Sequence, residues 1–256
     1  RKYSVGTTRK RISRKNIEKI KIPIPPLETQ QKIVAILDKA VKIKRLRAEA
    51  NAQTQKLIQS VFLDMFGDPM KNTKNFEKRR LGDLVDSIKK VDSSLLDQFH
   101  YIDIDSVDNY LNIISNPKII AGTEAPSRAR QLVRKDDILF STVRPYLKNI
   151  AIVPEYLDGQ VASTGFCIIR SKIPEFVPFL FHLLLSDSFV DSLKGFYRGA
   201  NYPAISPKDL MDYRIPFPSI DLLVKFNSRS RQIDTNLKNQ RKFLNEMTRF
   251  DELLTS

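Results

Sequence analysis

A pattern of strand, proline turn and helix occurs twice in the 256-residue chain, as IKIPIPPLETQQKIVAIL from residue 20 and as YRIPFPSIDLLVKF from residue 213. A shift of 193 residues aligns 6–28 with 199–221 without a gap, and seven of the 23 positions are identical. A repeat at this distance indicates two related structural units. Because only one globular segment separates the copies, we expect residues 1–26 to be the tail of an incomplete first unit.

Each copy leads into a long predicted helix. The first is expected over 27–66, since no glycine or proline interrupts the sequence before Gly67, which can cap the helix, and Pro69, which cannot continue it. Its seam of 4-3-4-3 spacing runs through Ile36, Ala40, Ile43, Arg47, Ala50, Thr54, Leu57 and Val61. The second seam, in a helix expected at about 220–254, runs through Phe226, Ser230, Ile233, Leu237, Gln240, Leu244, Met247, Asp251 and Leu254. Heptad spacing predicts that the two helices pack antiparallel as a coiled coil, although each could instead pack on its own domain.

The segment between the helices reads as one mixed α/β globule. Short β-branched or aromatic runs, broken by Pro, Gly or Asp, predict strands at HYIDI, LNIIS, DILFST, IAIVP and GFCIIR, and FVPFLFHLLLSDSFVDSL predicts a helix. We therefore predict an α+β fold in four parts: the tail at 1–26, a long spacer helix at 27–70, the globule at 71–219 and a second helix at 220–256.

Composition narrows the class of partner. The 43 Lys+Arg against 29 Asp+Glu give a formal charge of +14, most of it N-terminal, and this balance favours polyanions such as nucleic acid or an acidic membrane surface. The single cysteine, Cys167, excludes an internal disulfide and fits a reducing compartment as a core residue. The longest apolar run has ten residues, well short of a membrane span, and no signal peptide is evident. We expect a cytoplasmic protein with no membrane partner.

Four stretches in this order resemble the specificity (S) subunits of type I restriction-modification systems. They are ISRKNIEKIKIPIPPLETQQKIVAIL, its second copy ISPKDLMDYRIPFPSIDLLVKF, FGDPMKNTKNFEKRRLGDL as the start of a recognition domain, and VRKDDILFSTVRPYLKNIAIV within it. In that family two target recognition domains alternate with two long-helix regions. The resemblance implies a subunit that does no chemistry, reads a split double-stranded DNA sequence, and docks a DNA adenine methyltransferase subunit and a restriction (translocase-nuclease) subunit. This chain resembles the C-terminal half of such a subunit, or a half-length form.

Motifs for catalysis are absent from the sequence. No two of the eight glycines are separated by a single residue, and no phosphate-binding loop, Asn-Pro-Pro-aromatic motif or [DE]-x-K tripeptide occurs. The two histidines, His100 and His182, lie far apart, which argues against a metal site. We predict no catalytic residue, no metal and no cofactor.

Two stretches are candidates for contact with DNA, which requires guanidinium, amide or hydroxyl groups on presentable loops. The first, 127–148, is locally basic in a nearly neutral domain, and it provides Arg128, Arg130, Arg134, Arg144, Tyr146 and Lys148. The second, 197–206, provides Arg198, Asn201 and Tyr202 around Gly199. The alternatives are ordinary solvated charge for each arginine, and a structural turn before a helix capped by Ser206 for the second stretch.

Two other functions remain open at this stage. The chain could be a coiled-coil interaction scaffold without sequence-specific DNA binding, or an RNA-binding accessory protein. If it is a DNA reader, the repeat predicts that it reads one half of a bipartite target, and that a second recognition domain comes from another chain. A homodimer formed through the long helices is one arrangement that would supply it.

Overall fold

The computed structural model describes residues 12–199 and 201–233, and it divides the chain into two compact units, 1–49 and 50–256. The first unit contains the short helix α1 (Arg14–Ile17) and the start of α2 (Leu27–Phe66). The 40-residue span of α2 confirms the predicted first helix. A second helix is present at 220–233, so the predicted second helix is confirmed over these residues, and its expected continuation to 254 lies outside the described residues.

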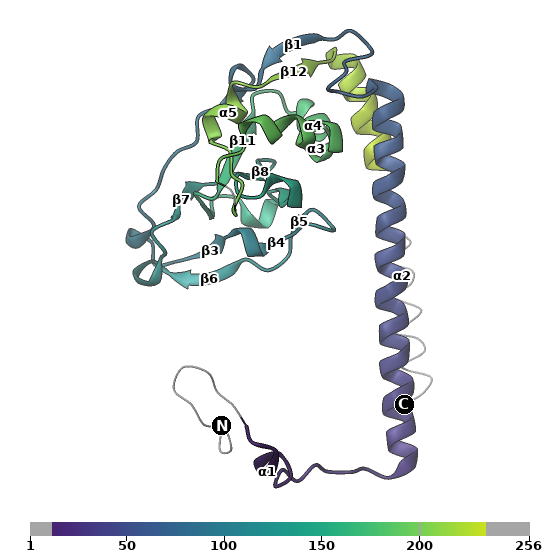
Figure 1. Cartoon of the computed structure of the whole chain (residues 1–256). Coiled ribbons are helices and arrows are strands. Elements are labelled where there is room, and N and C mark those ends of the chain that lie inside the picture. The colour runs from purple at the N-terminus through teal and green to yellow at the C-terminus, as the bar shows by residue number, and fades with distance from the viewer. Residues whose placement is uncertain (1–11, 200, 234–256) are drawn as a thin grey trace. The chain divides into compact units, whose positions relative to one another are not determined.

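The globule contains two four-stranded sheets and two strand pairs (Figure 1). One sheet has the order β2 (Val85–Asp86), β11 (Phe166–Ser171), β8 (Ile138–Ser141) and β9 (Ile150–Ile152), and the other β6 (Lys118–Ala121), β3 (Gln98–Ile102), β10 (Val161–Ser163) and β7 (Ala129–Leu132). All pairings in the two sheets are antiparallel except that of β3 with β10. The strand pairs are β1 (Glu77–Arg80) with β12 (Arg214–Phe217), and β4 (Val107–Asp108) with β5 (Ile113–Ile114).

Helices and short turns fill the remaining volume. The helices are α3 (Phe176–Leu185), α4 (Asp187–Ser192) and α5 (Pro207–Met211), and the 3-10 turns are η1 (Leu81–Asp83), η2 (Ser93–Leu95), η3 (Ile104–Ser106), η4 (Gly122–Glu124), η5 (Pro145–Leu147), η6 (Glu155–Leu157) and η7 (Leu193–Phe196). The mixed α+β class is therefore confirmed. All five predicted strand runs contain strands, and β12 lies in the second copy of the repeat, while β1, β2, β4, β6, β7 and β10 were not predicted.

Four phenylalanines join the end of α2 to two later helices. Phe62 and Phe66 of α2 contact Phe179 of α3 and Phe226 of the 220–233 helix, with ring centroids 4.7–5.8 Å apart. All four side chains are at most 1% exposed. The 220–233 helix runs beside residues 50–66 of α2 in the opposite direction (Figure 1). Antiparallel packing is thus observed for these parts of the two helices.

The predicted seam of α2 is wrong at Leu57, although its members Thr54 and Val61 are buried and partly buried. Leu57 is 51% exposed, whereas Ile58 and Phe62 are 3% and 1% exposed. The buried positions step by four through Thr54, Ile58, Phe62 and Phe66. The heptad spacing assumed one helical partner, but this part of α2 also packs against α3, and the larger aromatic residues determine which face is buried.

The two copies of the repeat start alike but differ in burial. Ser13 accepts a hydrogen bond from the Asn16 amide at 3.3 Å and caps α1, and Ser206 accepts one from the Asp209 amide at 3.1 Å and caps α5. In the second copy Ile215 lies in β12, which pairs with β1, and is fully buried. Its counterpart in the first copy, Ile22, is 75% exposed. The first copy thus shares the capped short helix of the second, but residues 20–26 do not form the strand predicted for both copies, and the packing is absent.

We expect Phe62→Ala to destabilise the 50–233 unit by about 3–5 kcal/mol, because it removes a fully buried ring that contacts three others and leaves a cavity. Urea unfolding followed by circular dichroism measures the change. The matched control is Leu63→Ala on the same helix turn, where the side chain is 44% exposed and the loss should stay below about 1 kcal/mol. Equal losses in the two variants would contradict the role given to the aromatic cluster.

Candidate nucleic-acid interface

The turn between β8 and β9 has an unusual backbone. Arg144 and Lys148 flank η5 with φ of +48° and +53°, the left-handed region that residues other than glycine rarely adopt. Pro145 occupies the first position of η5, where its fixed φ suits the turn. Residues in this region are kept there by contacts with their surroundings.

Contacts from two other segments fix the turn 144–148. The Arg144 amide donates to the Pro203 carbonyl at 2.7 Å. The side-chain amides of Asn109 and Asn112 donate to the carbonyls of Leu147 and Lys148, each at 2.9 Å. Sequence analysis did not identify these asparagines, and the signal available was their place in DNYLN, a stretch of turn-forming residues between two short strands.

The structure brings the two predicted DNA-contact stretches together. Ala204 forms antiparallel bridges to both Val143 and Arg198. As a result the guanidinium carbon of Arg144 lies 4.4 Å from the centre of the Tyr202 ring, which is 65% exposed. A guanidinium at this distance from an aromatic face forms a cation–π contact.

A hollow of about 390 Å³ adjoins this pair. Its lining includes Arg128, Arg144, Tyr202, Asp103, Asp105 and Ser163. Partial burial opposes the ionised form of Asp103, but hydrogen bonds from Lys118 and Ser106 stabilise it more, so the pKa of Asp103 lies below its ordinary value. Asp105 is exposed. The hollow therefore offers both hydrogen-bond donors and acceptors in ionised form.

The other predicted residues have different surroundings. Arg130 and Arg134 are exposed and do not line this hollow, and Tyr146 is 46% exposed on the turn itself. The Arg198 guanidinium is 3.2 Å from Asp209, which the Ser206 hydroxyl also contacts, and Asn201 is exposed beside Tyr202.

Lys148 lies apart from Arg144 although they flank the same turn. Its ammonium group pairs with Asp187 at the start of α4, and it lines a separate cavity of about 170 Å³. His182 lines that cavity too, and burial lowers its pKa to about 4, so its imidazole is neutral at pH 7.

Known proteins similar to this chain include specificity subunits of type I restriction enzymes. A family model described as the type I restriction modification DNA specificity domain matches residues 1–55. The type I restriction enzyme MjaVIII specificity subunit of Methanocaldococcus jannaschii is 27% identical over 263 residues, covering 93% of this chain and 60% of the relative. The HsdS subunit from Thermoanaerobacter tengcongensis has 36% identity and a TM-score of 0.56, over 71% of this chain and 48% of that one. A chain from a structure of complex assembly in the type I R-M system has 37% identity and a TM-score of 0.57, over 70% and 47%.

This chain is a relative of type I specificity subunits. The resemblance read from the sequence is therefore confirmed. The chain spans about half the length of the two solved chains that it matches, and 60% of the curated relative. These relatives are the specificity subunits of their systems, in agreement with the prediction of a non-catalytic chain.

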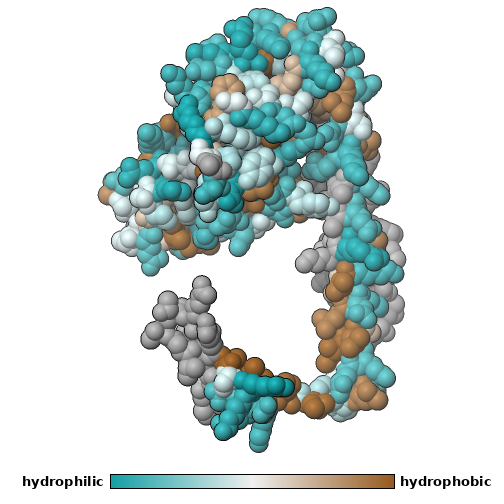
Figure 2. Space-filling model, viewed as in Figure 1, coloured by the Kyte–Doolittle hydropathy of each residue, from teal (hydrophilic) through white to brown (hydrophobic). Residues whose placement is uncertain are grey.

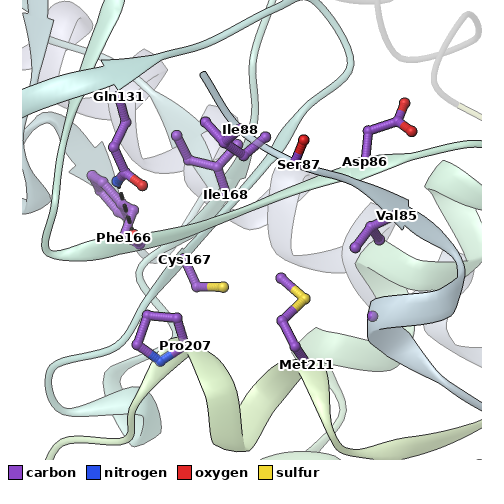
Figure 3. A pocket seen from close by; sticks show the side chains of 11 residues that line it. Val85, Asp86, Ser87, Ile88, Gln131, Phe166, Cys167, Ile168, Pro207 and Met211 are labelled. Carbon is purple, nitrogen blue, oxygen red and sulfur yellow. Dashed lines mark hydrogen bonds between the residues drawn. The ribbon is translucent and has the colours of Figure 1, made fainter. Parts of the chain in front are cut away.

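A second, larger hollow in this specificity-subunit relative lacks the features of a DNA contact. It has a volume of about 450 Å³ and lies where β2 and α5 approach β11 (Figure 3). Val85, Ile168 and Met211 contribute apolar groups, and the only charged side chain of its lining is that of Asp86. Cys167 also lines it, and burial raises the pKa of this thiol to about 12, so the thiol is neutral and not a nucleophile.

Within the described residues, no group of three or more His, Cys, Asp and Glu side chains is placed to hold a metal ion. No single helix among the described residues is long and apolar enough to cross a membrane. The consecutive helical segments 176–185 and 187–196 reach that length and apolarity only when taken together, and the chain bends by 66° between them.

A buried ion pair between Arg170 and Asp137 stabilises the backbone of the basic stretch 127–148. The Arg170 guanidinium donates to both carboxylate oxygens of Asp137, at 2.8 and 2.7 Å, and this contact raises the pKa of Arg170. Asp137, only 1% exposed, also accepts a hydrogen bond from the Arg134 amide. The pair thus fixes the backbone turn that carries Arg134.

We expect Arg170→Met to destabilise the protein by about 3–5 kcal/mol, because it leaves the Asp137 carboxylate buried without its cation. The double variant Asp137→Asn/Arg170→Met should regain much of this loss, since no charge then remains buried. Lys135→Ala is the control, because the Lys135–Glu155 pair is exposed and its loss should change the free energy of unfolding little. Urea unfolding at pH 7 measures all three, and a double variant no more stable than Arg170→Met would contradict this account.

Proposed function

We propose that this chain is a DNA-reading part of a type I restriction-modification complex. In this proposal residues 71–219 form a target recognition domain that binds double-stranded DNA in a sequence-specific way, and 27–70 and 220–256 form the conserved helices. The observation that carries it is the meeting of two basic stretches, 127–148 and 197–206, at Arg144 and Tyr202. The relationship to specificity subunits, whose family model is described as a DNA specificity domain, supports it.

The exposure of each side chain, and how firmly it is fixed, determines whether we assign it to phosphates or to bases. Exposed cations without a fixed geometry suit phosphates, which position a protein on DNA, whereas base edges require a fixed donor. We assign Arg128, Arg130 and Arg134 to phosphates, with Tyr146 and Asn201 beside them. Arg198, which is paired with Asp209, is a weaker candidate for the same role. Lys148, held by Asp187, contributes to the charge of the turn and has the weakest case for direct contact.

The chain is proposed to read one half of a bipartite target. The second copy of the repeat buries Ile205, Leu210 and Ile215 against the globule, and the corresponding residues of the first copy, Ile12, Ile17 and Ile22, are 41%, 53% and 75% exposed. This difference is the one expected if the first copy completes another recognition domain. A reader with two such domains would contact two separated half-sites.

The helices are the proposed contact for other subunits. Apolar side chains gather on the first half of α2 (Figure 2), and Val34, Leu37 and Val41 are 54%, 58% and 67% exposed. Such a face suits the antiparallel pairing predicted for 27–66 with 220–254, and docking of the methyltransferase and restriction subunits. Pairing with a second copy is the alternative, and the mass of the chain in solution distinguishes a homodimer from a monomer.

The test of DNA binding is its dependence on salt. We expect the chain to bind duplex DNA with an affinity that falls linearly on logarithmic axes as salt rises, because each phosphate contact releases counterions. Arg134→Ala should weaken binding for all sequences alike and reduce the slope by about 1. Lys194→Ala, which removes a cation paired with Asp191 outside both stretches, is the matched control and should leave the slope unchanged. A chain without duplex affinity at low salt would instead be the interaction scaffold, and one that prefers RNA of equal length would be the RNA-binding protein.

A further inference from the structure

We propose that Arg144 reads a guanine in the major groove, and that Tyr202 positions its guanidinium for this contact. The inference rests on the proposed DNA-binding function and goes beyond it by naming the base. It implies a G·C pair at a fixed place in the half-site that this chain recognises.

The side chain of Arg144 packs on the Tyr202 ring but lacks a hydrogen-bond partner for its Nε. Its Nε is buried and has no hydrogen-bond partner among the described residues. Nearly all buried polar groups in folded proteins are hydrogen-bonded, so an exception calls for an explanation. Because the Nε itself is buried, an external acceptor would bind the remaining N–H donors of the guanidinium, and the adjoining hollow of about 390 Å³, which Arg144 lines, has room for the edge of a base.

A second arginine of the chain, Arg79, also stacks on an aromatic ring and serves as a comparison for Arg144. Arg79 lies over the Phe217 ring at 4.3 Å, nearly the distance of Arg144 from Tyr202. The guanidinium of Arg79 also binds Glu77 at 2.8 Å, which satisfies its charge within the protein. Among the described residues no carboxylate forms such a pair with Arg144, so its donors remain available.

The geometry favours a base over a phosphate. The Arg144 backbone is fixed by the Pro203 carbonyl and its side chain by the Tyr202 ring, so few rotamers have to be given up on binding. A planar guanidinium matches O6 and N7 of guanine with two parallel hydrogen bonds, a pattern that no other base presents in the major groove.

The charges around the hollow support the same base pair. Asp105 is exposed on its lining, and its carboxylate would repel a phosphate. A carboxylate can accept a hydrogen bond from N4 of cytosine, the partner of guanine. Arg144 and Asp105 together therefore present a donor fork and an acceptor, the combination that suits the two edges of one G·C pair.

The experiment is a selection of duplexes from a randomised library by the full 256-residue chain, followed by titration of the selected duplex. We expect the wild type to select at least one invariant guanine. Arg144→Lys, which keeps the charge but removes the fork, should lose the preference for that guanine by roughly 5- to 150-fold and retain the other selected positions. Replacing the same guanine by 7-deazaguanine, which lacks N7, should weaken the wild type and leave Arg144→Lys unaffected.

Two variants test the role of Tyr202. Tyr202→Phe keeps the ring and should retain the preference, whereas Tyr202→Leu should reduce it without changing the salt dependence. Arg79→Lys is the matched control, because it alters the other arginine–aromatic pair and should leave the selected sequence unchanged. Thermal unfolding confirms that each variant is folded.

The outcomes separate this inference from the proposed function. If the wild type selects a sequence and Arg144→Lys selects the same one, or loses affinity equally for all duplexes, Arg144 is not a base-reading residue and the inference is overturned. If the wild type enriches no sequence, the proposed function fails, and the inference fails with it.

Discussion

The packing of Phe62 and Phe66 against Phe226 is the contact on which the globule depends, because it joins the segment before the globule to the segment after it. Phe179 of α3 packs on the same rings, so the core of the globule is continuous with the helix pair. The pairing of β1 with β12 follows from this closure, since the chain leaves α2 and returns to the 220–233 helix at the same place. The globule is therefore inserted between two helices that pack on each other, and its surface turns lie outside that helix contact.

The sequence predicted the elements with strong patterns and missed those without them. The bounds of α2 were predictable because Pro26 and Gly67 mark its ends and no breaker lies between them. Strand β1 was missed because Glu77–Arg80 carries only charged, exposed side chains, and it is a strand only because β12 pairs with it. Strand β7 was missed for a related reason, since its pairing with β10 is not visible in its own four residues.

The candidate site was predictable as a set of residue types but not as an arrangement. Basic composition indicated 127–148, and the glycine and asparagine of 197–206 indicated a second loop. That Arg144 stacks on Tyr202, 58 residues further along the chain, depends on the bridge between Val143 and Ala204. Lys148 looked equivalent to Arg144 in the sequence, yet Asp187 holds it on the other side of the turn. Such pairings over long sequence separations are set by the tertiary fold.

The left-handed backbone at Arg144 and Lys148 has a consequence for the evolution of this turn. Glycine adopts that conformation without the steric cost that a Cβ atom brings, typically about 1 kcal/mol or more. The turn therefore keeps two charged residues where a neutral one would fit the backbone better, and Asn109, Asn112 and Pro203 offset the strain. Under the role proposed for Arg144, stability and recognition are opposed at that position, so selection for a more heat-resistant protein alone would tend to replace this arginine by glycine.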